Sequence, residues 1–340
     1  MKFIFELNHP KHYYQFKYIM QELKNSGHNV LVLARDKDVL LDVLKEERVD
    51  YIVFGKHNKS LKAKILGTFA LINNYIRIVR KYGGDVIVSK ASFYGTFTAW
   101  LLRRKSVIFP DSEVVKVTNK YVVPICTKVV TPQSFALDYG NKHLRVSGLF
   151  EDCYLSPTVY QADSSVIEQY GLQKPYAVVR FVGWYANHDV GKNGFTIEEK
   201  ISLIDTISKS MTVYVSSERE LPESISQYKL PTPASRIHDV LSFADLYIGD
   251  SQTMATEAAL LGTPAIRSNS FVGPNDMSNF KMLETKYGLL HNIAEYDKVL
   301  ALAKDMSNNS CKKDWMEKRA LYYKNVGNVN DQIVNILANI

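Results

Sequence analysis

The sequence predicts an α/β protein built from two doubly wound, Rossmann-like domains that follow one another. Short β-rich runs alternate with longer amphipathic segments along most of the chain. Several of these runs, such as Val86-Ile87-Val88, are continuously apolar, which is typical of parallel strands buried on both faces. The 340 residues also suffice for about two domains of roughly 150 residues each.

The first half of the chain predicts a parallel sheet with crossover helices, and it opens with the order strand, helix, strand, helix, strand. We expect strands over residues 3–7, 29–34, 51–54, 85–89, 106–109 and 128–131. We expect helices over residues 10–25, 37–47, 61–82 and 94–103.

A polar segment that contains Ser156-Pro157 and Lys174-Pro175 separates the two halves, and a second alternation follows it. Its expected strands cover residues 176–182, 212–215, 245–248 and 264–267, and its expected helices cover residues 197–208, 238–243 and 253–261. The tail carries an apolar stripe at helical spacing. The predicted division is therefore a domain over 1–157, a domain over 158–318, and a helix over 319–340 that packs back on the first domain.

Composition limits the class of protein. With 46% hydrophobic and 23% charged residues, the chain matches a globular protein and neither a disordered nor a fibrous one. Three cysteines, odd in number and far apart, indicate no disulfide framework. The N-terminus lacks the apolar region of a signal peptide, and no apolar run reaches the roughly 20 residues that span a bilayer. A cytoplasmic location is expected.

The most informative motif is the predicted strand at 245–248 that ends in Gly249-Asp250-Ser251 and leads into a helix. The free N–H groups at the start of a helix form an anion-binding site that suits a diphosphate. Thr253 and Glu257 lie four residues apart on one helix face, so Thr253 can contact phosphate while Glu257 accepts hydrogen bonds from ribose hydroxyls. The alternative is that Glu257 merely favours the first helical turn.

The same residues carry a family resemblance. The run GDSQTMATEAALLGTPAI resembles the nucleotide-sugar motif of GT-B-type proteins, among them the lipid-linked N-acetylglucosaminyltransferase of peptidoglycan synthesis and the non-hydrolysing UDP-N-acetylglucosamine 2-epimerases. The segments NHPKHYYQFKYIMQELKNSGHNVLVLARDKD, GKHNKS, FPDSE and VVRFVGWYANHDVGKNGF resemble an uncharacterised GT-B-like family. The resemblance covers nearly the whole chain. It implies a GT-B fold, in which two Rossmann-like domains face a central cleft.

The resemblance also implies that the second domain binds a nucleotide-sugar donor and that the first lies on the acceptor side. Arg180 would pair with the donor diphosphate, a glycine-rich loop would close over sugar or phosphate, and backbone groups around Ile237 would read the base. The expected donor-binding residues are Arg180, Trp184, His188, Ile237, His238, Ser251, Gln252, Thr253 and Glu257. There are alternatives to these roles. Arg180 could be an ordinary surface arginine, the glycine-rich loop an ordinary connection between a strand and a helix, and His238 a helix cap.

In the first domain, His12 is the candidate general base, since an imidazole with a pKa near 6.5 can take a proton from an attacking sugar hydroxyl. Asp111 and Glu113 follow a predicted strand, and their carboxylates could act in general acid/base catalysis or bind sugar hydroxyls. Alternatively, His12 is a histidine at a helix terminus without a role in catalysis, and Asp111 and Glu113 are loop acids exposed to solvent. His9 and His12 lack a third ligand, so no metal is assigned.

The surplus of seven basic residues indicates an anionic partner. The expected helix over residues 59–82 is basic and contains no acid, so it could rest on an anionic membrane, or it could be a packed helix with a solvated basic face. No nucleic-acid motif, G-x-G-x-x-G or P-loop accompanies the charge, so nucleic-acid binding and dehydrogenase or P-loop chemistry are not expected.

The leading hypothesis is a metal-independent glycosyltransferase that moves a sugar from a nucleotide donor, UDP-linked by expectation, to a glycan or lipid-linked acceptor in cell-surface polysaccharide synthesis. It needs no cofactor beyond its nucleotide-sugar substrate, and it would act in the cytoplasm or at the inner face of the membrane. One alternative is a 2-epimerase in which Asp111, Glu113 and His188 shuttle protons. Another is a nucleotide-sugar-binding subunit without catalysis.

Overall fold

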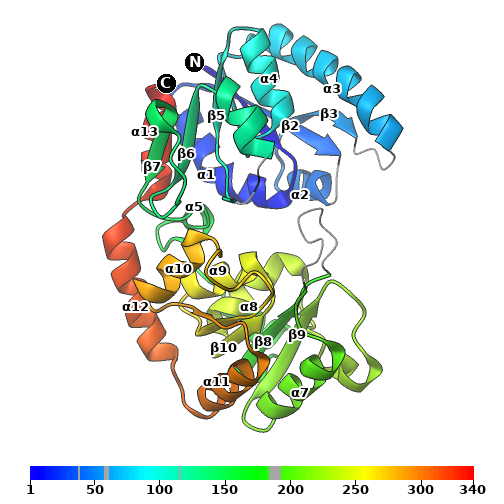
Figure 1. Ribbon diagram of the computed structural model, residues 1–340, viewed down its shortest axis with the longest axis vertical. Helices are drawn as coiled ribbons and strands as arrows, with labels where there is room; N and C mark the ends of the chain where they lie inside the picture. The colour runs from blue at the N-terminus through cyan, green and yellow to red at the C-terminus, as the bar shows by residue number, and fades with distance from the viewer. Residues whose placement is uncertain (37–38, 57–60, 114, 116, 184–192) are drawn as a thin grey trace. The chain divides into compact units, whose positions relative to one another are not determined.

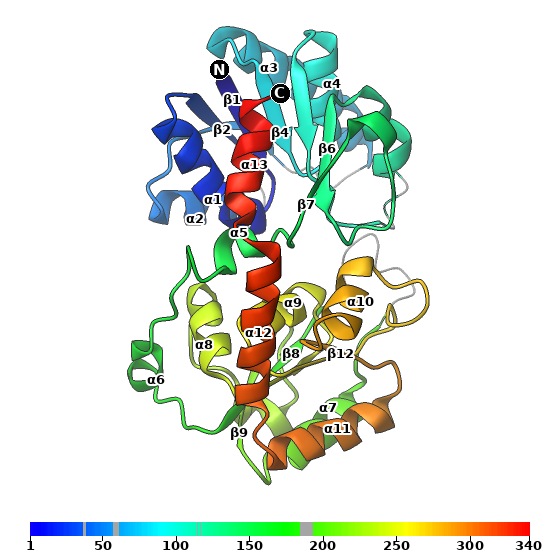
Figure 2. The ribbon, with the colours of Figure 1, turned by 90° about the vertical axis from the view of Figure 1, so that its left-hand side faces the viewer.

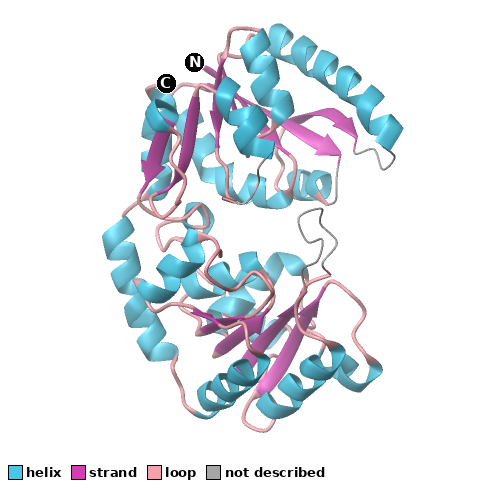
Figure 3. Ribbon diagram, in the orientation of Figure 1, coloured by secondary structure: helices cyan, strands magenta, loops and turns pink. Residues whose placement is uncertain are grey.

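The computed structural model describes residues 1–36, 39–56, 61–113, 115, 117–183 and 193–340. The chain forms two compact units. Unit 1 comprises residues 1–154 and 327–340, and unit 2 comprises residues 155–326. Each unit has a parallel sheet between helices (Figures 1 and 3), which confirms the predicted α/β class.

The sheet of unit 1 has seven parallel strands in the order β3-β2-β1-β4-β5-β6-β7. Because β1 lies inside the sheet and the chain first builds outward on one side of it and then on the other, the order is doubly wound. The strands are β1 Lys2–Leu7, β2 Asn29–Asp36, β3 Tyr51–Lys56, β4 Val86–Ser89, β5 Lys105–Ile108, β6 Lys128–Pro132 and β7 His143–Val146.

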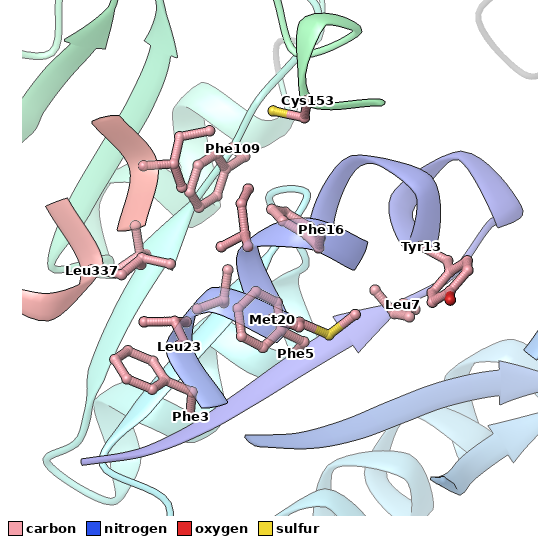
Figure 4. Packing of buried hydrophobic residues seen from close by; sticks show 14 of the residues in the cluster. Phe3, Phe5, Leu7, Tyr13, Phe16, Met20, Leu23, Phe109, Cys153 and Leu337 are labelled. Atoms are coloured by element: carbon pink, nitrogen blue, oxygen red, sulfur yellow. The ribbon is translucent and has the colours of Figure 1, made fainter. Parts of the chain in front are cut away.

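Helices cover both faces of this sheet. One face packs on α1 Pro10–Asn25, α2 Leu40–Glu46 and α13 Val329–Ala338, and the other on α3 Leu61–Tyr82, α4 Phe93–Leu101 and the short turns η1 Thr118–Val122 and η2 Val123–Ile125. The alternation along β1 decides which side chain meets which layer. Phe3, Phe5 and Leu7 pack against α1 (Figure 4), while Ile4 packs on the opposite side against α3 and α4.

The C-terminal segment returns to unit 1. The helix α12 Lys312–Val326 ends in unit 2, and Gly327 follows with a positive φ of 64°, a conformation that suits glycine. In α13, Val329, Ile333 and Leu337 are buried in the same core as Phe3 and Phe5, and α13 lies along one side of unit 1 (Figure 2). Residues 319–326 thus lie in α12 and in unit 2, and of the C-terminal segment residues 327–340 belong to unit 1.

Unit 2 has five parallel strands in the order β12-β11-β10-β8-β9. They are β8 Tyr176–Phe181, β9 Thr212–Ser217, β10 Leu246–Gly249, β11 Ala265–Arg267 and β12 His291–Asn292. The other helices are α5 Asp152–Leu155, where the chain leaves unit 1, and α6 Ser165–Gln169, α7 Ile197–Ile207, α8 Ile237–Phe243, α9 Gln252–Leu260, α10 Ser278–Thr285 and α11 Tyr296–Asn308. Within the described residues, none of the helices has the length and apolar character needed to cross a bilayer.

Candidate functional site

In unit 2, the turn between β10 and α9 forms the start of the candidate donor site. Ser251 caps α9 by accepting a hydrogen bond from the amide of Met254 at 3.3 Å. Among the residues that the structure describes, none accepts a hydrogen bond from the amides of Gln252 and Thr253. These two N–H groups, together with the positive end of the helix dipole, are available to an anion.

One turn further along α9, Glu257 pairs with a histidine of the preceding helix. Nε2 of His238 lies 3.3 Å from Oε1 of Glu257, and both side chains are largely buried. Burial acts to lower the pKa of His238, but the neighbouring carboxylate outweighs it, so the pKa of His238 is raised above its usual 6.5. The pair therefore fixes the carboxylate of Glu257 about one turn along α9 from the open amides.

The start of α8 is fixed by a second charged cluster. Asp239 is buried and accepts hydrogen bonds from the hydroxyl of Tyr160 at 2.7 Å and from the amide of Asp163 at 2.9 Å. Arg236 bridges Asp163 at 2.6 Å and Asp239 at 3.2 Å. Ile237 and His238 lie between Arg236 and Asp239 in the sequence. The cluster therefore sets the position of these two residues, which were predicted to contact the nucleotide.

Arg180, near the end of β8, is already engaged within unit 2. Its guanidinium donates to the hydroxyl of Ser216 at 2.8 Å and forms an ion pair with Glu218. The other oxygen of Glu218 accepts the amide of Gly183 at 2.9 Å. Arg180 thus belongs to the carboxyl edge of the sheet, with Glu218 balancing its charge.

Buried side chains lock the loops around β10. The carboxylate of Asp250 accepts the amide of Val182 at 2.8 Å, and its main-chain oxygen accepts the side-chain amide of Asn269 at 2.9 Å. Arg267, at the end of β11, is fully buried, pairs with Asp276 at 2.6 Å and lies 3.6 Å from the centre of the Phe280 ring. Arg267 was not among the residues predicted from the sequence, although a charge at the end of an apolar strand was the available signal.

In unit 1, a separate cluster lies at the carboxyl edge of the sheet. Lys90 directly follows β4, and its Nζ lies 3.4 Å from Oδ2 of Asp111 and 4.2 Å from the centre of the Phe150 ring. Burial lowers the pKa of Lys90, which Asp111 only partly offsets. Desolvation acts to raise the pKa of Asp111, but the cations Lys90 and Lys11 outweigh it and hold that pKa below its usual range.

His12, in the first turn of α1, belongs to this cluster. Its Nδ1 accepts the amide of Asn8 at 3.2 Å. Burial and the nearby charge of Lys90 lower the pKa of His12 to about 3, so the ring is neutral at physiological pH. Since Nδ1 is occupied as an acceptor, the proton of the neutral ring sits on Nε2. His12 is thereby set up as a hydrogen-bond donor.

Glu113 does not share the contacts of Asp111. Its Oε1 accepts the amide of Ala136 at 2.6 Å and so ties the segment after β5 to the segment after β6. The structure thus brings His12 and Asp111 together around Lys90, and it gives Glu113 a different set of contacts. Lys90 was missed because nothing in the sequence indicates that the ends of β4 and β5 lie side by side.

Two further charged residues of unit 1 were not predicted. Glu6 is buried in β1, where burial raises its pKa, and it accepts the side-chain amide of Asn8 at 2.9 Å. Glu151 pairs with Lys11 at 2.9 Å. Both fix the segment that carries His12, one from each end.

The remaining predicted residues fall into two groups. Ile237 and His238 begin α8, Ser251, Gln252 and Thr253 form the start of α9, and the contact between His238 and Glu257 joins the two helices. Trp184 and His188, as well as Lys59 of the basic helix, lie outside the described residues. No group of three or more metal-ligating side chains occurs in the part of the chain that the structure describes.

Two doubly wound units in sequence, with the helix-start motif in the second, define a GT-B fold, and solved structures support this over the full length. The chain is similar to a UDP-GlcNAc 2-epimerase from Methanocaldococcus jannaschii, with a TM-score of 0.71, 13% identity and 100% of both chains covered. It is also similar to the glycosyltransferase VinC in complex with dTDP, with a TM-score of 0.66, 10% identity and 99% of both chains covered. A UDP-GlcNAc 2-epimerase from Neisseria meningitidis bound to UDP-GlcNAc is similar with a TM-score of 0.65 and 12% identity, and 100% of both chains is covered.

The chain belongs to the family described as "Protein of unknown function (DUF354)", whose model matches residues 1–278. This confirms the expected membership of a GT-B-like family. A comparison with curated proteins finds no match.

Proposed function

We propose that this protein is a glycosyltransferase that uses a nucleotide-sugar donor, UDP-linked by preference, and a glycan or lipid-linked acceptor. The observation that carries the proposal is the His238–Glu257 pair on the same helix as the open amides of Gln252 and Thr253, about one turn from the start of α9. A buried, oriented carboxylate suits the two hydroxyls of a ribose, and the helix start suits the attached diphosphate. Solved structures of the same fold are described with dTDP and with UDP-GlcNAc bound, which supports this ligand class.

In the proposed reaction, an acceptor hydroxyl oxygen bonds to the anomeric carbon while the bond from that carbon to the diphosphate oxygen breaks. The amides at the start of α9 stabilise the charge that develops on the leaving diphosphate. Arg180 supplies further positive charge at the end of β8, shared with Glu218. Trp184, His188, Ile237 and Ser251 stay candidates for contacts to sugar, base and phosphate.

The proton of the acceptor hydroxyl goes to a group of unit 1. Asp111 can accept it, because its carboxylate is ionised and about half exposed, whereas Nε2 of His12 already carries a proton. We therefore assign Asp111 as the base and His12 as a donor that holds the acceptor oxygen in place. Glu113 would support the loop rather than the chemistry, since it is bonded to Ala136.

Calorimetric titration with UDP, dTDP, ADP and GDP tests the donor site. We expect UDP to bind the purified protein and Glu257→Gln to weaken that binding by about tenfold or more, the effect of losing a hydrogen bond to a charged group. Glu168→Gln is the matched control, because Glu168 is an exposed acid elsewhere in unit 2. The donor site is ruled out if no nucleotide binds or if both variants bind as the wild type does.

A second candidate function is a nucleotide-sugar 2-epimerase, which the Asp111–Lys90 pair favours. Elimination and re-addition require one group that takes a proton and another that returns it, and a carboxylate beside a lysine of lowered pKa can do both. Incubation with UDP-GlcNAc alone in D2O separates the two functions. An epimerase converts the sugar and incorporates deuterium without an acceptor, whereas a transferase leaves the sugar unchanged until an acceptor is added.

A third possibility, a binding subunit without catalysis, makes its own prediction. It requires UDP binding that depends on Glu257 but a cellular function that His12→Ala and Asp111→Asn leave intact. Complementation of a deletion strain with these variants, scored by cell-surface glycan, distinguishes it from both enzymes.

A further inference from the structure

The outer surface of the α3–α4–η1 layer of unit 1 is both apolar and basic. We call it the aromatic-basic face and define it as the exposed residues of α3 from residue 68 onward, of α4, and of segments 102–105 and 115–121, insofar as these are described. The inner side of this layer packs on the sheet through the core that contains Tyr75, Val79 and Ala99.

The apolar character of the face is concentrated in α4. Its buried side consists of Gly95, Thr96, Thr98 and Ala99. Its outer side also carries large apolar residues, with Trp100 55% and Leu101 48% exposed. Apolar helices of this kind are normally covered on both sides. The exposed side of α4 therefore lacks the polar surface expected of a helix that faces only water.

The aromatic rings on this side form a continuous row. The Phe93 and Phe97 rings stack with centroids 5.5 Å apart, and the Phe97 and Trp100 rings follow at 5.7 Å. Tyr121 of the adjacent η1 is 51% exposed, and Phe69 of α3 is 73% exposed. Among the described residues, all four exposed aromatic side chains lie on this face: Phe69, Phe93, Trp100 and Tyr121.

The charge of the whole chain is also concentrated here. Residues 61–125 contain eleven Lys and Arg and only three Asp and Glu, a surplus of eight, whereas the full chain has a surplus of seven. The rest of the chain is therefore close to neutral. Two of the three acids, Asp111 and Glu113, lie at the candidate site of unit 1, and Asp85 pairs with Arg104. Arg77, Arg80 and Lys81 are exposed on α3.

We infer that the aromatic-basic face binds the surface of an anionic phospholipid bilayer. Tryptophan and tyrosine favour the headgroup region of a bilayer, where the ring is buried and the polar edge stays hydrated. Arginine and lysine around them are attracted to anionic headgroups. Exposed aromatic rings among basic residues, where Asp85 pairs with Arg104 but the surplus of cations is large, fit this surface better than a neutral protein partner, which would leave most of the cations unmatched.

From the sequence, a membrane contact is expected on the basic helix over residues 59–82 alone. The structure adds α4 and η1 beside α3, and they supply the aromatic rings that α3 mostly lacks. The contact is peripheral and does not depend on the proposed activity.

Vesicle flotation with the full chain tests the inference. We expect binding to phosphatidylcholine vesicles that contain about 30% phosphatidylglycerol, little binding to pure phosphatidylcholine, and weakening by salt. Phe93→Ser/Trp100→Ser and Arg77→Gln/Arg80→Gln should each lower the partition coefficient by about tenfold. UDP affinity, measured on the same samples, should not change, which separates this test from that of the donor site.

Two matched controls remove similar groups elsewhere. Leu321→Ser removes a side chain that is 53% exposed in α12, and Lys24→Gln/Lys209→Gln removes two exposed cations. Both should bind vesicles as the wild type does. The fluorescence of Trp100, taken as the difference between wild type and Trp100→Phe, should shift to shorter wavelength only with anionic vesicles.

Three results would overturn the inference. The first is equal or absent binding to both kinds of vesicle. The second is an equal loss of binding in the control variants. The third is a dimer in sedimentation velocity that Phe93→Ser/Trp100→Ser abolishes, without any vesicle binding, because a second copy of the chain would then cover the face.

Discussion

Nε2 of His238 and Oε1 of Glu257 lie 3.3 Å apart and join α8 to α9 in unit 2. Nineteen positions separate the two residues in the sequence. Both residues were predicted from the sequence to contact a nucleotide, but nothing in the sequence indicates that they meet. Their pairing supplies the orientation that a ribose-binding carboxylate requires.

The raised pKa of His238 predicts a pH-dependent contribution of this pair to stability. A raised pKa in the folded state stabilises the protein below the unfolded value of 6.5, and this contribution is lost as the pH rises through the folded value. Glu257→Gln should therefore lower the free energy of unfolding more near pH 6 than at alkaline pH. Chemical denaturation across this range checks it, with Glu168→Gln as control, and a pH-independent difference would contradict it.

His12 should behave in the opposite way. Its pKa of about 3 lies below the unfolded value of 6.5, so the unfolded chain takes up a proton first and stability falls as the pH drops from 6.5 towards 3. NMR titration should show His12 neutral with its proton on Nε2, while His238 titrates above 6.5. His12→Asn should reduce the acid loss of stability. Protonation of His12 near pH 6 would refute the assignment.

The Lys90–Asp111 pair should show strong coupling. Asp111→Asn removes the carboxylate from a buried ammonium group, and we expect it to lower the free energy of unfolding by about 1–3 kcal/mol, less than for a fully buried pair because Asp111 is half exposed. The double variant Lys90→Met/Asp111→Asn should be more stable than Asp111→Asn alone. A double-mutant cycle measures the coupling, and additive effects would contradict it.

Arg267 should be among the most sensitive positions of unit 2. Arg267→Met leaves Asp276 buried without its cation, so we expect a loss of about 3–5 kcal/mol in the free energy of unfolding. Arg267→Lys keeps the charge but loses the second hydrogen bond to the carboxylate, and its effect should be smaller. Thermal and chemical unfolding test both variants, and a neutral Arg267→Met would disprove the role.

The docking of α13 should contribute measurably to unit 1. Ile333→Ala removes a fully buried side chain from the core shared with Phe3 and Phe5, at an expected cost of about 2–5 kcal/mol. Asn335→Ala, on the exposed side of the same helix, should change stability by less than about 0.5 kcal/mol. Hydrogen exchange of β1 amides reports the effect on unit 1 directly, and equal protection in the two variants would argue against it.

Most elements with strong periodicity were predicted, but α10 Ser278–Thr285 and the amphipathic α11 Tyr296–Asn308 were missed. The helix expected over residues 253–261 is α9 at 252–260, and the apolar run around Ile87 is β4. The strands β7 and β12 were missed, since four residues and two residues carry too little alternation to be recognised. The helix α12 was not separated from α13, although Gly327 marks the break.

The sequence by itself determined the α/β class, the two-unit order and the helix start at Ser251, because apolar periodicity and helix-cap chemistry act over a few neighbouring residues. Only the tertiary structure decided that His238 meets Glu257, that Lys90 meets Asp111, and that Glu113 turns to another loop. These contacts depend on which strands become neighbours in the sheet. Strand order is fixed by packing over the whole unit, and no local pattern records it.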